Sequence, residues 1–214
     1  HGIQTAYELM QCSDNWIRKT ISISGVRIVE ELKGISCYSI DDSRLFKKNI
    51  CVSRTFGKKN ILFNDLKEAV STYAFICGFK LRKQGGCAKK ITVVLYANSF
   101  KNKYHLNCDI IKTIYLNTPI SDSFKIIFNA MIALKHIYRA DYNYRKAGVI
   151  VSGIIHKGEE QLNCFDNINN LNKRSRIMEA MDSLNVSANQ ISLCFAVNGF
   201  KREWKSRQAF LSPK

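Results

Sequence analysis

Residues 49–57 read NICVSRTFG, and they begin the most regular part of the sequence. The stretch is rich in residues that favour extended backbone and it ends at Gly57, so it predicts a β-strand. The next segment, residues 64–83, starts with a capping residue, Asn64 or Asp65, and predicts an amphipathic helix. The apolar residues that share one face of this helix are Leu66, Val70, Tyr73, Cys77 and Leu81.

The alternation of strand and helix continues toward the C-terminus. Segments 90–97 (KITVVLYA), 108–116 (CDIIKTIYL) and 146–155 (KAGVIVSGII) predict three more strands. Ser121 or Asp122 caps a second helix, whose apolar face contains Phe124, Ile127, Phe128, Met131, Leu134 and Tyr138. The order β-α-β-β-α-β predicts an α+β fold, a ferredoxin-like sheet of four antiparallel strands with two helices on one face. The other face is left open to solvent or to a partner.

The charge of the chain indicates what that partner is. Among 214 residues, 33 Lys and Arg against 17 Asp and Glu give a formal net charge of +16. Such an excess is typical of a protein that binds a polyanion, and we expect nucleic acid. An anionic membrane surface and a general drift of the composition toward lysine are the alternatives.

The basic residues follow the predicted strands, and no acidic residue occurs from Ser43 to Asn64. We expect the sheet to lie along a phosphate backbone through these side chains. The alternative is that they are solvated lysines that keep edge strands from pairing with other chains. The residues concerned are Lys47, Lys48, Arg54, Lys58, Lys59, Lys89, Lys90, Lys112, Arg145 and Lys146.

The segments on either side of the sheet are shorter and less regular. Residues 1–34 predict short helices, with Ser13 and Ser24 as N-caps and Gly34 just after a helix C-terminus. After the sheet, a helix is predicted at 173–184 on the pattern of Ile177, Met178, Met181 and Leu184. A strand at 191–197 (ISLCFAV) and a basic end that contains Trp204 follow it.

The sequence shows no catalytic or metal-binding arrangement. Nucleotide-binding glycine motifs, the GxSxG motif and the HExxH motif are all absent. His136 is predicted on the polar side of its helix, the Asp41–Asp42 pair falls in a linker, and Glu159 and Glu160 are expected to be solvated. We therefore predict no catalytic residue and no metal site.

The eight cysteines have no zinc-binding spacing, since none lies two to four residues from another. They predict free thiols in a reducing cytoplasm. The sequence has no run of 18 apolar residues, so we expect no membrane partner.

Several segments together resemble the UmuC family, the catalytic subunits of DNA polymerase V among the Y-family translesion polymerases. The resemblance is collinear and covers essentially the whole chain. It rests on GIQTAYELMQCSDNWIRKTISISGVRIVEELKGISC (2–37), ICVSRTFGKK (50–59), YRKAGVIVSGI (144–154), QLNCFD (161–166), MDSLN (181–185) and WKSRQAFLSPK (204–214).

The resemblance implies a division of the chain into domains. Residues 1–35 would be the end of a helical thumb and 36–46 a linker. Residues 47–156 would be the DNA-binding little finger. A second linker at 157–171 and a C-terminal extension at 172–214 complete the chain.

The same resemblance implies contacts with DNA. By position, Ser53, Arg54 and Thr55 on the first strand would contact the backbone, flanked by Lys47, Lys58 and Lys59. Arg18 and Lys19 are the candidates in the thumb. We expect Arg54→Ala to weaken binding.

The linker peptide resembles motifs that bind a sliding clamp. Gln161 would form hydrogen bonds at the rim of the clamp's pocket, while Leu162 and Phe165 would fill it. Asn163 and Cys164 complete the motif, and Cys164 stands where a larger aliphatic residue is more usual. The alternative is that Leu162 and Phe165 pack back on the little finger.

The resemblance therefore implies a DNA-binding and clamp-tethering portion of an error-prone translesion polymerase in SOS repair and mutagenesis. The complete polymerase would use Mg²⁺, held by palm carboxylates that this chain lacks, so the chain alone is expected to be inactive and to bind no cofactor. A UmuD-type dimer and a recombinase filament are further partners that the resemblance suggests. An RNA-binding ferredoxin-like module, with Phe56, Tyr96 and Tyr115 as stacking residues, and a non-functional gene remnant remain alternatives.

Overall fold

The computed structural model divides the chain into two compact units, which are described separately: His1–Leu45 and Phe46–Lys214. The residues that the structure describes are 1–38, 46–58, 60–99, 107–161, 168–188 and 192–206.

The N-terminal unit contains three short helices, α1 (Ala6–Met10), α2 (Asp14–Thr20) and α3 (Ile23–Leu32). Their small core consists of Ile17, Val26 and Val29. So few buried side chains give the unit little stability of its own.

The helix ends of this unit agree with the sequence at two positions and differ at one. Ser13 precedes α2 as predicted, and Gly34 has the left-handed φ of 85° expected after a helix C-terminus. The N-cap of α3 is Ser22 and not Ser24, because the backbone carbonyl of Ser22 accepts bonds from the Gly25 and Val26 amides. The helix therefore begins earlier than the apolar pattern indicated.

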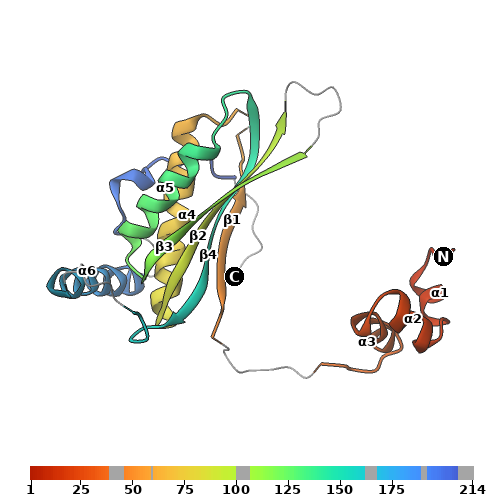
Figure 1. Ribbon diagram of the computed structural model, residues 1–214. Coiled ribbons are helices and arrows are strands. Elements are labelled where there is room, and N and C mark those ends of the chain that lie inside the picture. The colour runs from red at the N-terminus through yellow and green to blue at the C-terminus, as the bar shows by residue number, and fades with distance from the viewer. Residues whose placement is uncertain (39–45, 59, 100–106, 162–167, 189–191, 207–214) are drawn as a thin grey trace. The chain divides into compact units, whose positions relative to one another are not determined.

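The second unit is built on one antiparallel sheet with the predicted order of elements (Figure 1). Its strands lie in the order β1-β4-β2-β3, so β4 separates β1 from β2, and β2 separates β4 from β3. Each β-α-β unit is thus split by another strand, and the α+β prediction is confirmed. The strands are β1 (Asn49–Thr55), β2 (Gly86–Ser99), β3 (Asn107–Ile120) and β4 (Tyr142–His156).

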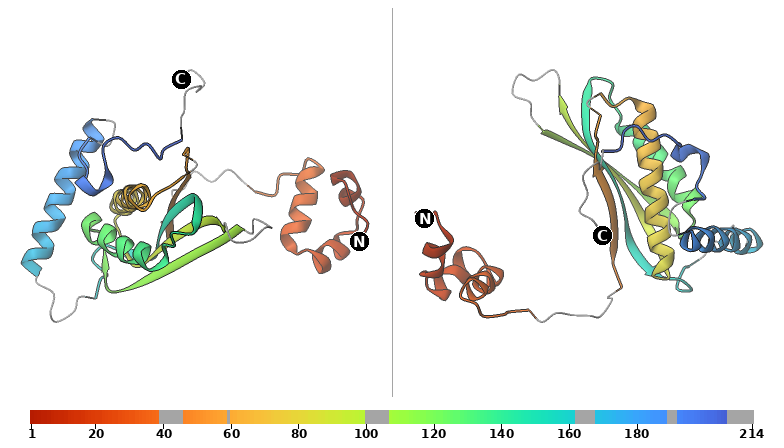
Figure 2. Two further views of the ribbon diagram at one scale, coloured as in Figure 1. Left: turned by 90° about the horizontal axis from the view of Figure 1, so that it is seen from above. Right: turned by 180° about the vertical axis from the view of Figure 1, so that it is seen from behind.

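Two long helices, α4 (Phe63–Lys83) and α5 (Ser123–Ile137), lie side by side on one face of the sheet (Figure 2). The predicted apolar face of α4 is buried as expected, from Leu66 to Leu81. Strand residues such as Ile91, Val93 and Leu95 complete the core beneath it. This face of the sheet is called the covered face below.

Three details of these helices bear on the predictions. The N-cap of α4 is Leu62, and Asp65 lies inside the first turn, where its Oδ2 accepts the Leu62 amide at 3.0 Å. Asp122 caps α5 as predicted. Phe124 and Phe128 are 49% and 58% exposed, because they lie on the side of α5 that faces away from the sheet.

A third helix, α6 (Ile168–Ser187), covers the predicted segment 173–184 and extends beyond it at both ends. Met178 and Met181 are buried in the main core, whereas Ile177 and Leu184 are more than half exposed. Only half of the predicted apolar pattern therefore packs on the domain.

The predicted strand at 191–197 is wrong over its described residues, 192–197. They contain no strand and end in a short 3₁₀ helix, Ala196–Asn198. The side chain of Asn185 accepts the amides of Ser192 and Leu193 and donates to the Leu193 carbonyl. Since the buried Asn185 side chain already forms hydrogen bonds with these backbone groups, they need no neighbouring strand as a partner.

Candidate nucleic-acid interface

Among the described residues of the second unit, no helix lies on the other face of the sheet, which we call the open face (Figure 2). Directly paired residues of neighbouring antiparallel strands point to the same side, so the register defines its rows. From β1 across to β3, three rows are Asn49-Ser152-Lys90-Tyr115, Cys51-Ile150-Thr92-Thr113 and Ser53-Gly148-Val94-Ile111, and from β1 to β2 a fourth is Thr55-Lys146-Tyr96.

The two middle rows of the open face combine hydroxyl groups with aliphatic side chains such as Ile150 and Ile111. Thr92 and Thr113 share a hydrogen bond of 2.8 Å between their hydroxyl groups, across β2 and β3. Gly148 lies so close to β1 that an added Cβ would come within 2.8 Å of the Ser53 Cβ. Small side chains at these positions allow a long, smooth partner to approach the strands closely.

A lysine lies over a tyrosine in each of the outer rows. Lys90 Nζ is 5.2 Å from the centre of the Tyr115 ring, and Lys146 Nζ is 4.8 Å from the Tyr96 ring. These cation–π contacts position the ammonium groups without neutralising them. The two rows lie six positions apart along β2, which is about 20 Å or roughly six base pairs along a duplex.

The other cations on the predicted strands lie elsewhere. Arg54 pairs with Ala147 and Lys112 pairs with Val93, and both partners are fully buried on the covered face. Arg54 and Lys112 are therefore exposed residues at the two edges of that face. Arg54 Nη1 donates to the carbonyl of Ser53 at 2.9 Å.

The remaining predicted cations lie at strand ends. Lys47 and Lys48 are exposed just before β1, and Lys89 is exposed where the pairing register of β2 shifts. Arg145 is exposed on β4, where the pairing register between β4 and β2 shifts opposite Tyr96 and Ala97. Lys58 lies beyond β1, where its Nζ is 3.4 Å from Asp65.

The last of the predicted contacts belong to other parts of the chain. Lys59 lies outside the described residues. Arg18 and Lys19 are both exposed in the last turn of α2. The open face thus brings together Ser53, Thr55, Lys90 and Lys146 from the predicted set. The tyrosine under each lysine is not visible as a partner in the sequence, because it comes from a neighbouring strand.

The start of the predicted clamp motif is anchored. Glu160 was expected to be solvated, but its carboxylate accepts the Cys87 thiol at 2.7 Å and the Gly158 amide at 2.5 Å. Burial acts to raise the pKa of Glu160, yet these hydrogen bonds and nearby Lys157 outweigh it and lower the pKa below 4.5. Gln161 follows and is exposed. The other motif residues, Leu162, Asn163, Cys164 and Phe165, lie outside the described residues.

Side chains that could bind a metal ion do not form a cluster in the part of the chain that the structure describes. In it, no group of three or more His, Cys, Asp or Glu residues could hold a metal ion. Burial raises the pKa of the Cys77 and Cys87 thiols to about 12, which leaves both protonated and unreactive. No helix among the described residues is long and apolar enough to cross a membrane.

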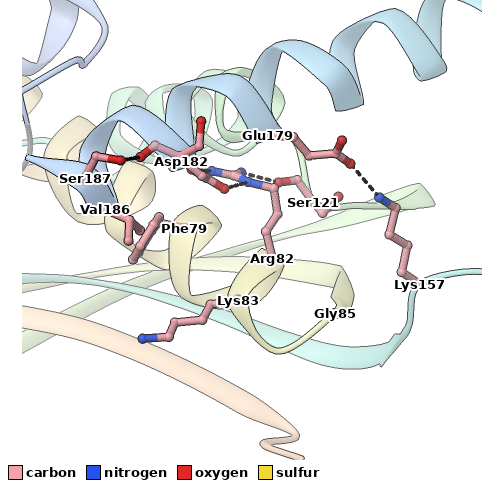
Figure 3. Close-up of a pocket in the computed structure, with 12 residues that line it drawn as sticks. Phe79, Arg82, Lys83, Gly85, Ser121, Lys157, Glu179, Asp182, Val186 and Ser187 are labelled. Atoms are coloured by element: carbon pink, nitrogen blue, oxygen red, sulfur yellow. Dashed lines mark hydrogen bonds and ion pairs between the residues drawn. The ribbon is translucent and has the colours of Figure 1, made fainter.

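The cavity in Figure 3 lies where α6 meets the end of α4, and it has a structural explanation. Arg82 donates to both carboxylate oxygens of Asp182, at 2.6 and 2.7 Å, and also to the Ser121 carbonyl and the Ser123 hydroxyl. Lys157 pairs with Glu179 at 3.2 Å on the same side. The cavity of about 480 Å³ is thus bordered by the ion pairs that hold α6 in place.

Comparison with known proteins gives two family matches. Residues 47–164 match the impB/mucB/samB family C-terminal domain. Residues 175–214 match a domain of unknown function (DUF4113).

Individual relatives extend the similarity to the whole chain. It is 31% identical over 215 residues to Protein UmuC and 33% identical over 213 residues to Protein ImpB, both of Salmonella typhimurium. It is also 31% identical over 214 residues to Protein MucB of Escherichia coli. These alignments cover 99–100% of the chain and 49–50% of each relative, so the chain spans about half the length of the curated relatives it matches.

Proposed function

Because this chain belongs to the impB/mucB/samB family, we propose that it is the DNA-binding and clamp-tethering part of an error-prone translesion DNA polymerase. One observation carries this proposal: the open face presents two lysines, about 20 Å apart, on a surface that no described helix of the same unit covers. Their spacing along β2 suits two separate phosphates of one backbone rather than a single small anion.

The residues between the lysines explain how damaged DNA would be tolerated. The middle of the face contains hydroxyl, thiol and aliphatic side chains and one glycine, and no side chain there is suited to bidentate recognition of a base. Ser53, Thr55, Lys90 and Lys146 would hold phosphates, which are the same whatever the base. The module would therefore position the duplex without selecting its sequence.

The clamp tether is the second half of the proposal. Glu160 is fixed to the end of the sheet, and Gln161 is the first exposed residue of the motif. From there the peptide through Phe165 would reach a pocket on a sliding clamp. Two apolar side chains contribute roughly 1.5–3 kcal/mol each, so the tether would be weak and exchangeable.

The wider setting follows from the same family. The complete polymerase would act in the cytoplasm during SOS repair and mutagenesis, with Mg²⁺ bound by carboxylates of its palm. A UmuD-type dimer and a recombinase filament would be its accessory partners. The part described in this structure would supply the grip on DNA and not the chemistry.

The DNA grip is tested by fluorescence anisotropy with a labelled primer–template duplex. We expect the affinity of the chain to fall steeply with salt, with a slope of log K against log salt of about −0.9 for each phosphate that is bound. Lys90→Gln with Lys146→Gln should weaken binding about tenfold. Lys135→Gln with Lys173→Gln, on α5 and α6, removes the same charge as a control and should change binding less than twofold.

A flat salt dependence, or equal losses in the two double variants, would contradict the DNA grip. The tether has a separate test, in which an immobilised sliding clamp captures the chain. Leu162→Ala with Phe165→Ala should abolish capture, whereas Asn163→Ala should reduce it little. Undiminished capture by the first variant would mean that the two side chains pack elsewhere.

One observation favours an RNA-binding module as a second candidate. Tyr96 and Tyr115 both lie on the open face, and Tyr115 is 71% exposed. The ammonium group of a lysine nevertheless lies over each ring, where a base would have to stack. Phe56, the third predicted stacking residue, is buried. Competition between single-stranded RNA and duplex DNA decides between the two, and RNA would have to displace the duplex to support this candidate.

A further inference from the structure

The segment after α6, residues 192–206, returns across α4 to the end of β1, and we call it the C-terminal strap (Figure 2). The hydroxyl group of Ser71 donates to the Val197 carbonyl at 2.9 Å, and that of Thr72 donates to the Asn198 carbonyl at 3.3 Å. Both donors are buried in α4. The path of the strap is therefore built into the core of the domain.

Trp204 fixes the far end of the strap. It is 3% exposed and meets the Phe56 and Tyr73 rings edge to face, at 6.2 and 5.7 Å. The Gly57 amide donates to the Trp204 carbonyl at 3.0 Å. A Cβ on Gly57 would lie 2.7 Å from the Ser206 Cα, so only glycine lets the strap approach this closely.

The strap and the end of β1 enclose an open hollow of about 880 Å³, which we call the strap hollow. Three cations and one carboxylate line it: its residues are Gly57, Lys58, Arg202, Glu203, Lys205 and Ser206. Lys58 Nζ forms an ion pair with the carboxylate of Asp65 at 3.4 Å. Within the described residues, neither Arg202 nor Lys205 has a carboxylate at ion-pair distance.

The backbone of Arg202 is unusual. Its φ of 43° is the one positive φ of a non-glycine residue among those described, and the Lys205 amide closes the turn by donating to its carbonyl at 3.0 Å. Its Nε is shielded from solvent and has no hydrogen-bond partner in the described part of the chain. A side chain with a Cβ keeps this conformation only where its surroundings impose it. The turn thus fixes the backbone from which this side chain extends, and no carboxylate among the described residues pairs with its guanidinium.

We propose that the strap hollow binds a backbone phosphate of the same DNA that lies along the open face. This inference rests on the proposed function. Gly57 follows two residues after Thr55, which shares a row of the open face with Lys146, so the hollow begins within about 7 Å of that row. A duplex on the open face would bring phosphates to the hollow, where Arg and Lys are the side chains that bind them.

The inference gives a role to a segment matched as a domain of unknown function. The strap would extend the DNA interface past the edge of the sheet, and α6 and Trp204 would hold it in place. An acidic surface of a protein partner is the competing occupant, because it offers the same charge. DNA is favoured because Gly57, which lines the hollow, follows two residues after Thr55 of the open face.

The test compares three double variants of the full chain by anisotropy with labelled duplex DNA over a range of salt concentrations. They are Arg202→Gly with Lys205→Gln in the strap hollow, Lys90→Gln with Lys146→Gln on the open face, and Lys135→Gln with Lys173→Gln as the control. Glycine is chosen at position 202 because it adopts a positive φ without strain, so removal of the cation should not unfold the strap. Thermal melting and the fluorescence of Trp204 check the fold.

We expect the strap variant to bind DNA about three- to tenfold more weakly and to flatten the salt slope by about 0.9 for each phosphate that it no longer binds. The control should weaken binding less than twofold. If the strap variant behaves as the control does while the open-face variant binds more weakly, the strap inference is wrong and the proposed function stands. If neither variant weakens binding, both fail. A melting temperature well below that of the unaltered chain, with Arg202→Gly alone still at full affinity, would also overturn the inference.

Discussion

The two faces of the sheet are made by the same strands, yet they differ in almost every property. On the covered face, Ile91, Val93 and Leu95 are fully buried. Of their sequence neighbours on the open face, Lys90 is exposed, Thr92 is partly exposed and Val94 is buried. Since successive side chains of a strand point to opposite sides, stability and binding are assigned to alternate residues of one segment.

Because of this separation, the domain can vary one property without the other. A change on the covered face should alter packing and the free energy of unfolding while the charge of the open face stays the same. A change on the open face should alter the proposed binding of DNA while the covered face keeps its packing.

The same substitution on the two faces should have very different costs. Ile91→Ala removes a fully buried side chain and should lower the free energy of unfolding by about 3–4 kcal/mol. Ile111→Ala removes a side chain that is 57% exposed on the open face and should cost less than about 1 kcal/mol. Urea unfolding measures both. Equal costs would mean that the open face is covered in solution, by another copy of the chain for example.

The ion pairs of α6 belong to the covered side as well. The Arg82 and Asp182 side chains are only 11% and 19% exposed, so Asp182→Ala leaves an almost buried guanidinium without its carboxylate. We expect the free energy of unfolding to fall by about 2 kcal/mol, less than for a fully buried pair because some solvent reaches both groups. Urea unfolding and proteolysis of α6 measure this. Lys157→Gln, which breaks the exposed pair with Glu179, is the control and should cost under about 0.5 kcal/mol.

Removal of two cations from the covered face should weaken DNA binding less than removal of two cations from the open face. Arg54→Gln with Lys112→Gln removes cations that belong to the covered face, at its two edges. We expect affinity to fall about two- to threefold, which reflects long-range attraction alone and disappears at high salt. Lys90→Gln with Lys146→Gln should lower affinity about tenfold and also reduce the salt slope. A larger effect from the first pair would place the DNA along an edge of the sheet.

The positions of these charges show what could be predicted from the sequence. Helical spacing correctly assigned the buried face of α4, because that pattern depends only on local geometry. The family resemblance predicts one set of DNA contacts on the first strand, Ser53, Arg54 and Thr55. Consecutive residues of a strand, however, point alternately to the two faces of the sheet. Only the central one, Arg54, is turned to the covered side. The alternation of side chains along the predicted strand already indicated this from the sequence.

Other features could not have been predicted, because they depend on contacts between distant segments. The pairing of Lys146 with Tyr96 requires the register between β4 and β2. The segment 192–197 has residues that favour a strand, but the side chains of Asn185 and Ser71 bind its backbone instead. Tertiary hydrogen bonds there override a weak β propensity.

The smallest expected effect concerns Glu160, which directly precedes the proposed clamp motif. A carboxyl group whose pKa is lowered on folding stabilises the fold above its unfolded pKa, near 4.5, and this stabilisation is lost as the pH falls through the lower folded value. Cys87→Ala removes the thiol donor and should move the pKa of Glu160 back toward 4.5. Cys87→Ser retains a donor and should keep the pKa low. Carbon-13 NMR of the Glu160 carboxyl group measures both, and an unchanged pKa in the alanine variant would show that the thiol does not anchor this residue. The tether would then begin at Gly158 and not at Gln161, which would lengthen the reach of the clamp peptide from the DNA-binding sheet.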